Sequence, residues 1–150
     1  MGEFTGYCRH GATKICIFDG IMDADLYCNI LETNLLPFIR EKLPVHQFMQ
    51  DNDPKHTSGQ AKAAFEENNI NWWPTTPESP DLNPIEDMWH ELKFYLESKV
   101  KPCTKQELVD GIKKFWERKV TPLKCTKYID HVLYKAIPAV VEVQGAATKF

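Results

Sequence analysis

The spacing of hydrophobic positions predicts a strand and then a helix near the start of the chain. Residues 14–18 (KICIF) form a short apolar run that Asp19 and Gly20 close, which is typical of a strand followed by a turn. Asp23 is placed to cap a helix whose apolar residues recur with helical spacing. Pro37 is expected to kink or end that helix.

Two further strands are predicted around a second helix. The strands cover residues 46–51 and 70–73, and the helix between them covers 57–68. The next segment, WWPTTPESPDLNP, contains four prolines and is expected to be a stiff, extended connection. Strands that alternate with helices predict an α/β architecture.

Three helices are predicted to complete the chain. The first begins with Asn83 as N-cap, the second with a capping box of Thr104 and Glu107, and the third near Thr126. Pro138 is expected to kink the third helix. The apolar positions expected to be buried are Ile85, Met88, Trp89, Leu92 and Leu96 in the first helix, Leu108, Ile112, Phe115 and Trp116 in the second, and Ile129, Val132, Leu133, Ala136, Ile137 and Val140 in the third.

Composition and cysteine usage favour an intracellular globular protein without a membrane partner. The 150 residues contain no apolar run of the roughly 18 residues that a membrane span requires, and the first residues lack the apolar stretch of a secretory signal. Five scattered cysteines without C-x-x-C spacing indicate reduced thiols rather than disulfides or a zinc site.

Charge is distributed unevenly, although the net charge is only −3. Residues 1–86 carry 6 basic and 13 acidic side chains, whereas residues 87–150 carry 12 basic and 8 acidic ones. The basic half predicts either a surface that contacts phosphates or an ordinary solvated helix surface. Its candidate phosphate contacts are Lys113, Lys114, Arg118, Lys119, Lys124 and Lys127.

Asp51 lies at the predicted end of a strand, where ligands bind in open α/β sheets. It belongs to the segment QDNDPKHTS, whose polar residues have a second explanation as an Asx-type turn and helix N-cap, with Asp53 and His56 solvated. A transition-metal site formed by His46, Asp51, Asp53 and His56 is a further alternative, which no paired-ligand spacing supports.

Glu86 also has two explanations. It lies three residues after Asn83, where a glutamate folds back on the helix cap and meets the positive end of the helix dipole. As a functional residue, it would be a second acid at the mouth of the same predicted sheet as Asp51. The occurrence of two such polar segments in one chain favours the functional explanation.

The segments QDNDPKHTS and SPDLNPIEDMW resemble the second and third acidic motifs of the mariner superfamily of DDE-type transposases, with 34 residues between Asp51 and Glu86. The resemblance extends over nearly the whole chain, including GIMDADLYCNIL, WHELK and KYIDHVL. It implies a ribonuclease H-like α/β fold, with a mixed sheet flanked by helices and a C-terminal helical extension. It also implies that residues 1–150 form one partial catalytic domain without the helix-turn-helix domain that precedes it in the family.

The resemblance implies metal-dependent cleavage and transfer of DNA strands. In this family three carboxylates hold two Mg²⁺ or Mn²⁺ ions about 4 Å apart, and hard carboxylate oxygens suit these ions. Asp51 and Glu86 would be the catalytic, metal-binding acids, and Asn52, His56 and Asn83 would have supporting or DNA-facing roles. The implied partners are transposon-end DNA and either a second copy of the chain or an upstream segment, and the implied location is the nucleus.

The first catalytic Asp of the family, which lies on the first strand of the fold, has no counterpart in this sequence. Residues 7–18 are expected to be the remnant of the second strand and the whole third strand, and Asp19, Asp23 and Asp25 follow them. The third strand would lie three strand spacings, or roughly 14 Å, from the strand that carries Asp51, which is too far for one metal pair.

We therefore expect the isolated chain to be inactive or nearly so. The missing central strand is expected to leave unpaired strand edges, which favour association or aggregation. The alternative function is a non-catalytic remnant of a transposase that binds nucleic acid or protein.

Overall fold

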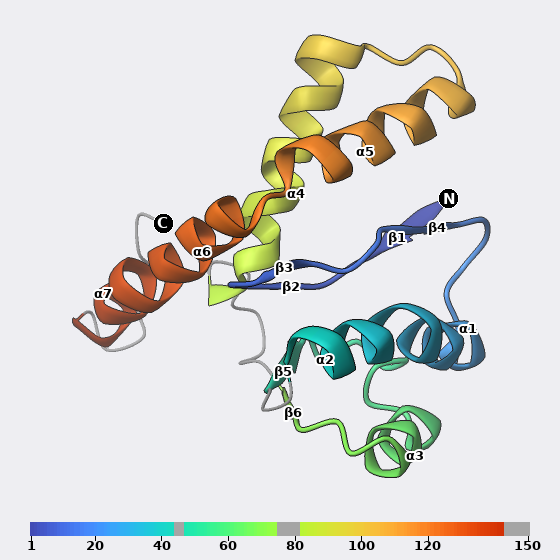
Figure 1. The fold of residues 1–150 in the computed structure, drawn as a ribbon, viewed down its shortest axis with the longest axis vertical. Coiled ribbons are helices and arrows are strands. Elements are labelled where there is room, and N and C mark those ends of the chain that lie inside the picture. Colours follow the sequence, from blue (N-terminus) through green and yellow to red (C-terminus); the bar gives the residue numbers. More distant parts are fainter. Residues whose placement is uncertain (44–46, 75–81, 143–150) are drawn as a thin grey trace. The chain divides into compact units, whose positions relative to one another are not determined.

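The computed structural model describes residues 1–43, 47–74 and 82–142. The chain divides into two compact units, each of which is described by itself (Figure 1). Unit 1 comprises Met1–Gly6 and Thr13–Glu78, and unit 2 comprises Tyr7–Ala12 and Ser79–Phe150.

Unit 1 contains two strand pairs of opposite kind. Strand β1 (Gly2–Phe4) pairs antiparallel with β4 (Cys16–Phe18), whereas β5 (Phe48–Gln50) pairs parallel with β6 (Trp72–Pro74). Among the described residues each of these strands pairs with a single other strand, so β1 and β5 each keep an unpaired edge. Unpaired edges of this kind are where a further strand can pair.

The predicted strands 14–18, 46–51 and 70–73 are confirmed as β4, β5 and β6, each shorter than predicted, and β6 ends one residue later than predicted. The expectation that the first strand remnant begins at residue 7 is wrong, because β1 already begins at Gly2. Its three residues are too few to show the alternation by which a strand is recognised in a sequence. Most of the predicted proline-rich connection, residues 75–81, lies outside the described residues.

The helices of unit 1 form two segments. They are α1 (Ala24–Ile30), the π-helical turn η1 (Leu31–Leu35) and α2 (Leu36–Lys42) in the first segment, and α3 (Gly59–Glu67) in the second. As predicted, Asp23 caps α1, because its side chain accepts a hydrogen bond from the Leu26 N–H at 2.9 Å.

Pro37 does not end the first helical segment. The backbone widens into η1 before it, where the Leu36 N–H donates to the Leu31 carbonyl. Because proline has no N–H and its ring crowds the preceding turn, the irregularity expected at Pro37 takes the form of this π-helical turn. Pro37 then lies in the first turn of α2, where a missing donor is tolerated.

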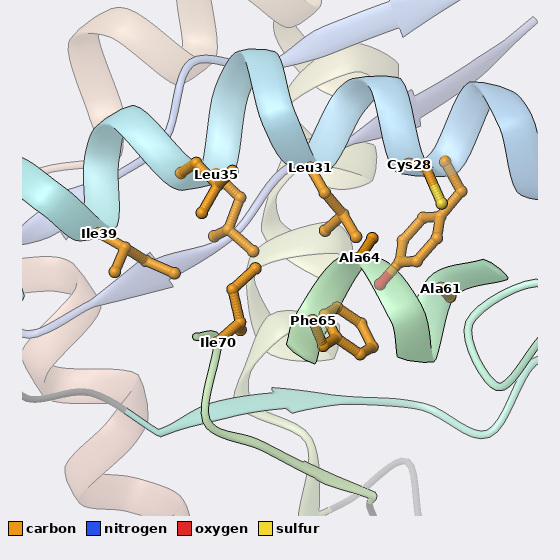
Figure 2. Close-up of a cluster of buried hydrophobic side chains, with 10 residues drawn as sticks. Cys28, Leu31, Leu35, Ile39, Ala61, Ala64, Phe65 and Ile70 are labelled. Atoms are coloured by element: carbon orange, nitrogen blue, oxygen red, sulfur yellow. The ribbon is translucent and has the colours of Figure 1, made fainter. Parts of the chain in front are cut away.

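The hydrophobic core of unit 1 lies between its two helical segments, and Figure 2 shows its side chains. Leu31 and Phe65 are each 1% exposed, and burial of such a side chain stabilises the fold by roughly 1.5–3 kcal/mol. Phe4, Phe48 and Trp72, one residue from each of β1, β5 and β6, pack against this cluster. The core therefore holds both strand pairs to the same helices.

Unit 2 contains a short hairpin, in which β2 (Tyr7–Cys8) pairs antiparallel with β3 (Gly11–Ala12). Helix α6 (Pro122–His131) packs on this hairpin. The guanidinium of Arg9 at the hairpin turn forms an ion pair with Asp130 of α6 at 2.5 Å. This contact joins the N-terminal hairpin to helices far along the chain.

The remaining described residues of unit 2 are almost entirely helical. Besides α6 the elements are α4 (Pro84–Tyr95), η3 (Leu96–Val100), α5 (Lys105–Lys119), η4 (Val132–Ala136) and α7 (Ile137–Glu142). The predicted caps are confirmed: the side chain of Asn83 accepts from the Ile85 N–H, and Thr104 and Glu107 form the capping box of α5. None of the described helices is both long and apolar enough to span a membrane.

Helix α6 begins at Pro122, earlier than the predicted start near Thr126. Thr121 is its N-cap, because its side chain accepts a hydrogen bond from the Lys124 N–H at 3.3 Å. A cap residue followed by proline is itself a helix-start signal. This signal precedes the apolar positions from which the helix was predicted, so the predicted start was too late.

Two residues of the C-terminal helix are exposed where burial was expected. Leu133 is 45% and Ile137 38% exposed, whereas Val132 and Ala136 are buried. The π-helical turn η4 lies across this stretch and changes the helical phase, so that the buried stripe no longer follows the regular spacing. As at Pro37, the helix continues through Pro138 after such a turn.

Candidate active site

Asp51 follows directly after strand β5 and begins the loop that leads to α3. Its side chain is 61% exposed, whereas Gln50, the last residue of β5, is 7% exposed. Asp51 therefore lies at the carboxyl end of a strand, as predicted, and its side chain is exposed there.

The loop of residues 51–58 is held by its own hydrogen bonds. The Asp53 N–H donates to Asp51 Oδ1 at 3.3 Å and the Lys55 N–H donates to Asp53 Oδ1 at 3.1 Å, which gives two successive Asx turns. The predicted Asx turn is thus present, and Ser58 supplies the N-cap of α3. The turn uses one oxygen of the Asp51 carboxylate, so it is compatible with metal binding.

Asp53 is paired within the loop rather than simply solvated. Lys55 Nζ donates to Asp53 Oδ2 at 2.5 Å. Partial burial raises the pKa of Asp53, but the hydrogen bonds and the charge of Lys55 outweigh this effect and hold the pKa below its ordinary value. Asp53 therefore serves the loop itself.

His56 lies beside Asp51 and is only 13% exposed, so the expectation that it is solvated is wrong. Its Nδ1 is hydrogen-bonded to Asp51 Oδ1. A carboxylate oxygen only accepts, so Nδ1 carries the proton. The imidazole also packs on the ring of Tyr27, with centroids 4.4 Å apart. This arrangement fits a supporting role for His56 better than a DNA-facing one.

Glu86 lies in the first turn of α4 and is exposed. Its backbone N–H donates to the carbonyl of Asn83 at 3.1 Å, and Asn83 is the N-cap residue. Pro84 in the first turn and Asn83 as cap fix where the helix begins. Glu86 is thereby held in the first turn, at the positive end of the helix dipole.

Asp51 belongs to unit 1 and Glu86 to unit 2. The meeting of their carboxylates at one metal site therefore stays a prediction. Asn52 is exposed beside Asp51 in the same loop. In residues 1–43, 47–74 and 82–142, no group of three or more His, Cys, Asp or Glu side chains is arranged to hold a metal ion. His46, a member of the alternative transition-metal site, lies outside these ranges.

The candidate phosphate contacts differ in their surroundings. The exposed ones are Lys113, Lys114, Arg118 and Lys119 of α5 and Lys127 of α6. Lys124 instead forms an ion pair with Glu91, whose other carboxylate oxygen accepts a hydrogen bond from the Tyr128 hydroxyl. The charge of Lys124 is therefore compensated within unit 2.

Two residues near Asp51 were not predicted as site residues. The Tyr27 hydroxyl donates to Gln50 Oε1, and Gln50 Nε2 donates to the His56 carbonyl at 3.2 Å. The sequence pattern placed Tyr27 on the apolar face of a helix, and it placed Gln50 in the segment before Asp51 without a role of its own. A glutamine at the end of a short predicted strand was the available signal, because a buried amide needs polar partners.

Residues 4–109 match the family model of the DDE superfamily endonucleases. The chain belongs to the DDE superfamily. Asp51 and Glu86 both lie within the part that matches this superfamily.

The curated relatives of this DDE superfamily chain are transposases of transposable elements. It is 35% identical over 134 residues to the Tcb1 transposase of Caenorhabditis briggsae and 32% identical over 133 residues to the Tc1 transposase of Caenorhabditis elegans. Each alignment covers 87% of this chain and 47% of the relative. The chain thus spans about half the length of the curated relatives it matches. These relatives confirm the resemblance to the mariner superfamily.

Solved structures of Mos1 mariner transposase share the fold of this DDE superfamily chain. The Mos1 catalytic domain with Raltegravir and Mg matches with a TM-score of 0.83 at 17% identity, covering 97% of this chain and 75% of that one. The Mos1 paired-end complex with Mn matches with a TM-score of 0.82 at 16% identity, covering 99% of this chain and 46% of that one. The predicted ribonuclease H-like α/β fold is confirmed.

Proposed function

We propose that this chain is a portion of the catalytic domain of a cut-and-paste DNA transposase, with Asp51 and Glu86 as two of its three metal-binding carboxylates. The observation that carries the proposal is the exposed carboxylate of Asp51 at the end of β5. A hydrogen bond within its own loop holds this carboxylate in place, and the chain belongs to the DDE superfamily. Glu86, exposed in the first turn of α4, supplies the second carboxylate.

Mg²⁺ or Mn²⁺ is the proposed cofactor. Solved structures of the Mos1 catalytic domain contain Mg or Mn. Asp51 and Glu86 offer exposed carboxylate oxygens, the ligands that such hard cations prefer. When bound, two such ions activate the attacking oxygen and stabilise the leaving oxygen at phosphorus. Other features of this chain hold the two metal-binding acids in place. The Asx turn orients Asp51, and Asn83 fixes the start of the helix that carries Glu86.

Transposon-end DNA is the proposed partner. A Mos1 paired-end complex contains a left transposon end. The exposed basic side chains of α5 are the proposed phosphate contacts in this chain, namely Lys113, Lys114, Arg118 and Lys119. The curated relatives are transposases of nematodes, whose chromosomal DNA lies in the nucleus, which is the proposed location.

We infer that these 150 residues do not cleave DNA by themselves. In the family pattern a third acid lies on a strand beside the one that carries Asp51, and β5 has an unpaired edge there among the described residues. An upstream segment or a second chain would supply that strand. Until it does, the exposed edge favours self-association.

A chimeric transposase tests the proposal. This chain replaces the matching residues of the Tcb1 transposase, and the chimera is assayed for Mg²⁺-dependent nicking of DNA that carries transposon ends. We expect nicking by the chimera and none by the 150-residue chain alone. Nicking by the chain alone that disappears in Asp51→Ala and Glu86→Ala would show that the chain is complete and refute the third-acid argument.

Matched variants separate the catalytic acids from their neighbours. In the chimera, Asp51→Asn and Glu86→Gln should abolish nicking, because a neutral amide binds a divalent cation weakly. Glu66→Gln and Asp87→Asn change an exposed acid of the following helix α3 and an acid in the same turn as Glu86, and should leave most of the activity. Equal loss in both pairs would contradict the assignment.

A non-catalytic binding module is the second candidate, favoured by the exposed basic face of α5. Binding through phosphates should weaken steeply as salt rises. Binding through an apolar surface should not. A filter-binding titration at several salt concentrations, with Lys113→Gln and Lys114→Gln as variants, distinguishes the two modes.

A further inference from the structure

The side chain of Gln50 is buried directly before the exposed Asp51 and has two hydrogen-bond partners, one of which is a backbone carbonyl that can only accept. Its Nε2 lies 3.2 Å from the backbone carbonyl of His56, which can only accept, so this atom is the amide nitrogen. Its Oε1 then faces the Tyr27 hydroxyl and accepts from it. The amide of Gln50 therefore ties the far end of the 51–58 loop to helix α1.

Tyr27 is fully buried in the core of unit 1, so its phenol cannot move without moving the core. Its ring makes edge contacts with Phe4 at 5.9 Å and Phe65 at 6.5 Å between centroids. Burial raises the pKa of Tyr27, which keeps the hydroxyl protonated as a donor to Gln50. The acceptor oxygen of Gln50 is thus held from a rigid site.

His56 connects this buried pair to Asp51. Its backbone carbonyl is held by Gln50, and its ring packs on Tyr27 at 4.4 Å with 36° between the ring planes. Its Nδ1 is hydrogen-bonded to Asp51 Oδ1. The same residue therefore touches the core with one side of its ring and the exposed carboxylate with its edge.

We propose that Tyr27 and Gln50 are positioning residues for Asp51, acting through His56. The proposal rests on the proposed function of Asp51 as a metal ligand. Partners that orient metal ligands typically change metal affinity by about 10–100-fold when they are removed. Gln50 fixes the backbone of His56, and Tyr27 fixes its ring. Because His56 is hydrogen-bonded to Asp51 Oδ1, the carboxylate is presented in one orientation.

The test uses the whole 150-residue chain and two variants. Tyr27→Phe keeps the ring that packs on His56 and removes the hydrogen bond to Gln50, and Gln50→Met replaces the amide by an apolar chain of similar length. Tyr128→Phe is the matched control, because it also removes a hydroxyl that donates to a side-chain oxygen, here of Glu91 in unit 2. Thermal melting reports the stability of all three variants.

The first readout is the side-chain nitrogen NMR spectrum of His56 at one fixed pH at which imidazole is neutral. We expect the proton on Nδ1 in the wild-type chain and in Tyr128→Phe, and a mixture of tautomers in Tyr27→Phe and Gln50→Met. A role that was merely structural would lower the melting temperature without changing this signal. An unchanged His56 spectrum in either folded variant would overturn the proposal.

The second readout needs no variant. In the wild-type chain, nuclear Overhauser effects should connect the Gln50 amide protons with the Tyr27 ring, and the Tyr27 ring with the His56 ring. Their absence would also overturn the proposal, so it can be judged even if neither variant folds.

The third readout is Mn²⁺ binding, followed by paramagnetic broadening of the backbone signals of residues 51–58. The Mn²⁺ concentration for half-maximal broadening should rise roughly 10-fold in Tyr27→Phe and Gln50→Met, and stay unchanged in Tyr128→Phe. An Asp51→Asn variant separates the two proposals. If it leaves the broadening unchanged, the metal-ligand assignment of Asp51 fails, whereas the His56 spectrum still decides whether Tyr27 and Gln50 position the loop.

Discussion

The imidazole of His56 lies against the phenol ring of Tyr27, with ring centroids 4.4 Å apart. This contact joins the loop that begins with Asp51 to helix α1 and hence to the core of unit 1. The loop is therefore part of the packed structure and not an independent surface turn.

Replacing His56 with Ala should destabilise the chain. We expect the free energy of unfolding to fall by about 1–2 kcal/mol, because aromatic ring contacts contribute roughly 0.5–1.5 kcal/mol beyond their buried area and the buried ring itself is lost. Urea denaturation measures the change. His10→Ala, at an exposed position, is the control and should change stability by less than about 0.5 kcal/mol. Equal losses would mean that the ring contact contributes nothing.

Glu91 should make the stability of the chain depend on pH. Partial burial raises its pKa, but hydrogen bonds from Lys124 and Tyr128 and the nearby positive charges outweigh burial, so the pKa lies below the ordinary value. A depressed carboxylate pKa contributes stability that is present above the unfolded-state pKa and lost as pH falls through the folded-state pKa.

The Glu91→Gln variant checks this dependence. Its free energy of unfolding should be about 1–2 kcal/mol lower than that of the wild type at neutral pH, after allowance for partial exposure. The difference should disappear well below the ordinary glutamate pKa. Glu117→Gln on the exposed face of α5 is the control. A deficit of equal size at all pH values would rule out the charge as its cause.

Gly111 of α5 should not tolerate a side chain, although glycine is a poor helix former. An added Cβ would lie 2.9 Å from Leu96 Cδ2 and 3.0 Å from Val100 Cγ1, and a β-branched valine has little freedom to move away. We expect Gly111→Ala to lower stability by up to about 2 kcal/mol, since overpacking outweighs the gain in helix propensity. Gly59→Ala at the start of α3, where nothing lies within 4 Å, should not be destabilising. A rise in melting temperature for Gly111→Ala would contradict the close approach.

The cysteines should differ sharply in reactivity. Cys103 is exposed, whereas Cys125 is fully buried and burial raises the pKa of its thiol to about 11. Because the thiolate is the reactive form, iodoacetamide should modify Cys103 in the folded chain and Cys125 only after unfolding. Mass spectrometry of the peptides measures both rates. Comparable rates in the folded chain would show that helix α6 opens from the hairpin on which it packs.

Local signals in the sequence were sufficient for the starts of α1, α4 and α5 and for the acidic motif. Asp23, Asn83 and Thr104 each cap a helix as predicted, because a cap bonds to a backbone N–H only two or three residues away. The position of Asp51 after a strand follows in the same way from a short apolar run and a polar turn. The motif around Asp51 and Glu86 also led to the family that the relatives confirm.

Only the tertiary structure decided which side chains surround Asp51 and which face of the C-terminal helix is buried. Tyr27 meets Gln50 and His56 through contacts between residues far apart in the chain, and no local spacing encodes them. Leu133 and Ile137 are exposed because a π-helical turn and the packing partners of the helix, rather than its regular period, determine its buried side. Caps and turns depend on neighbours along the chain, whereas burial and side-chain pairing depend on which distant surfaces fold against one another.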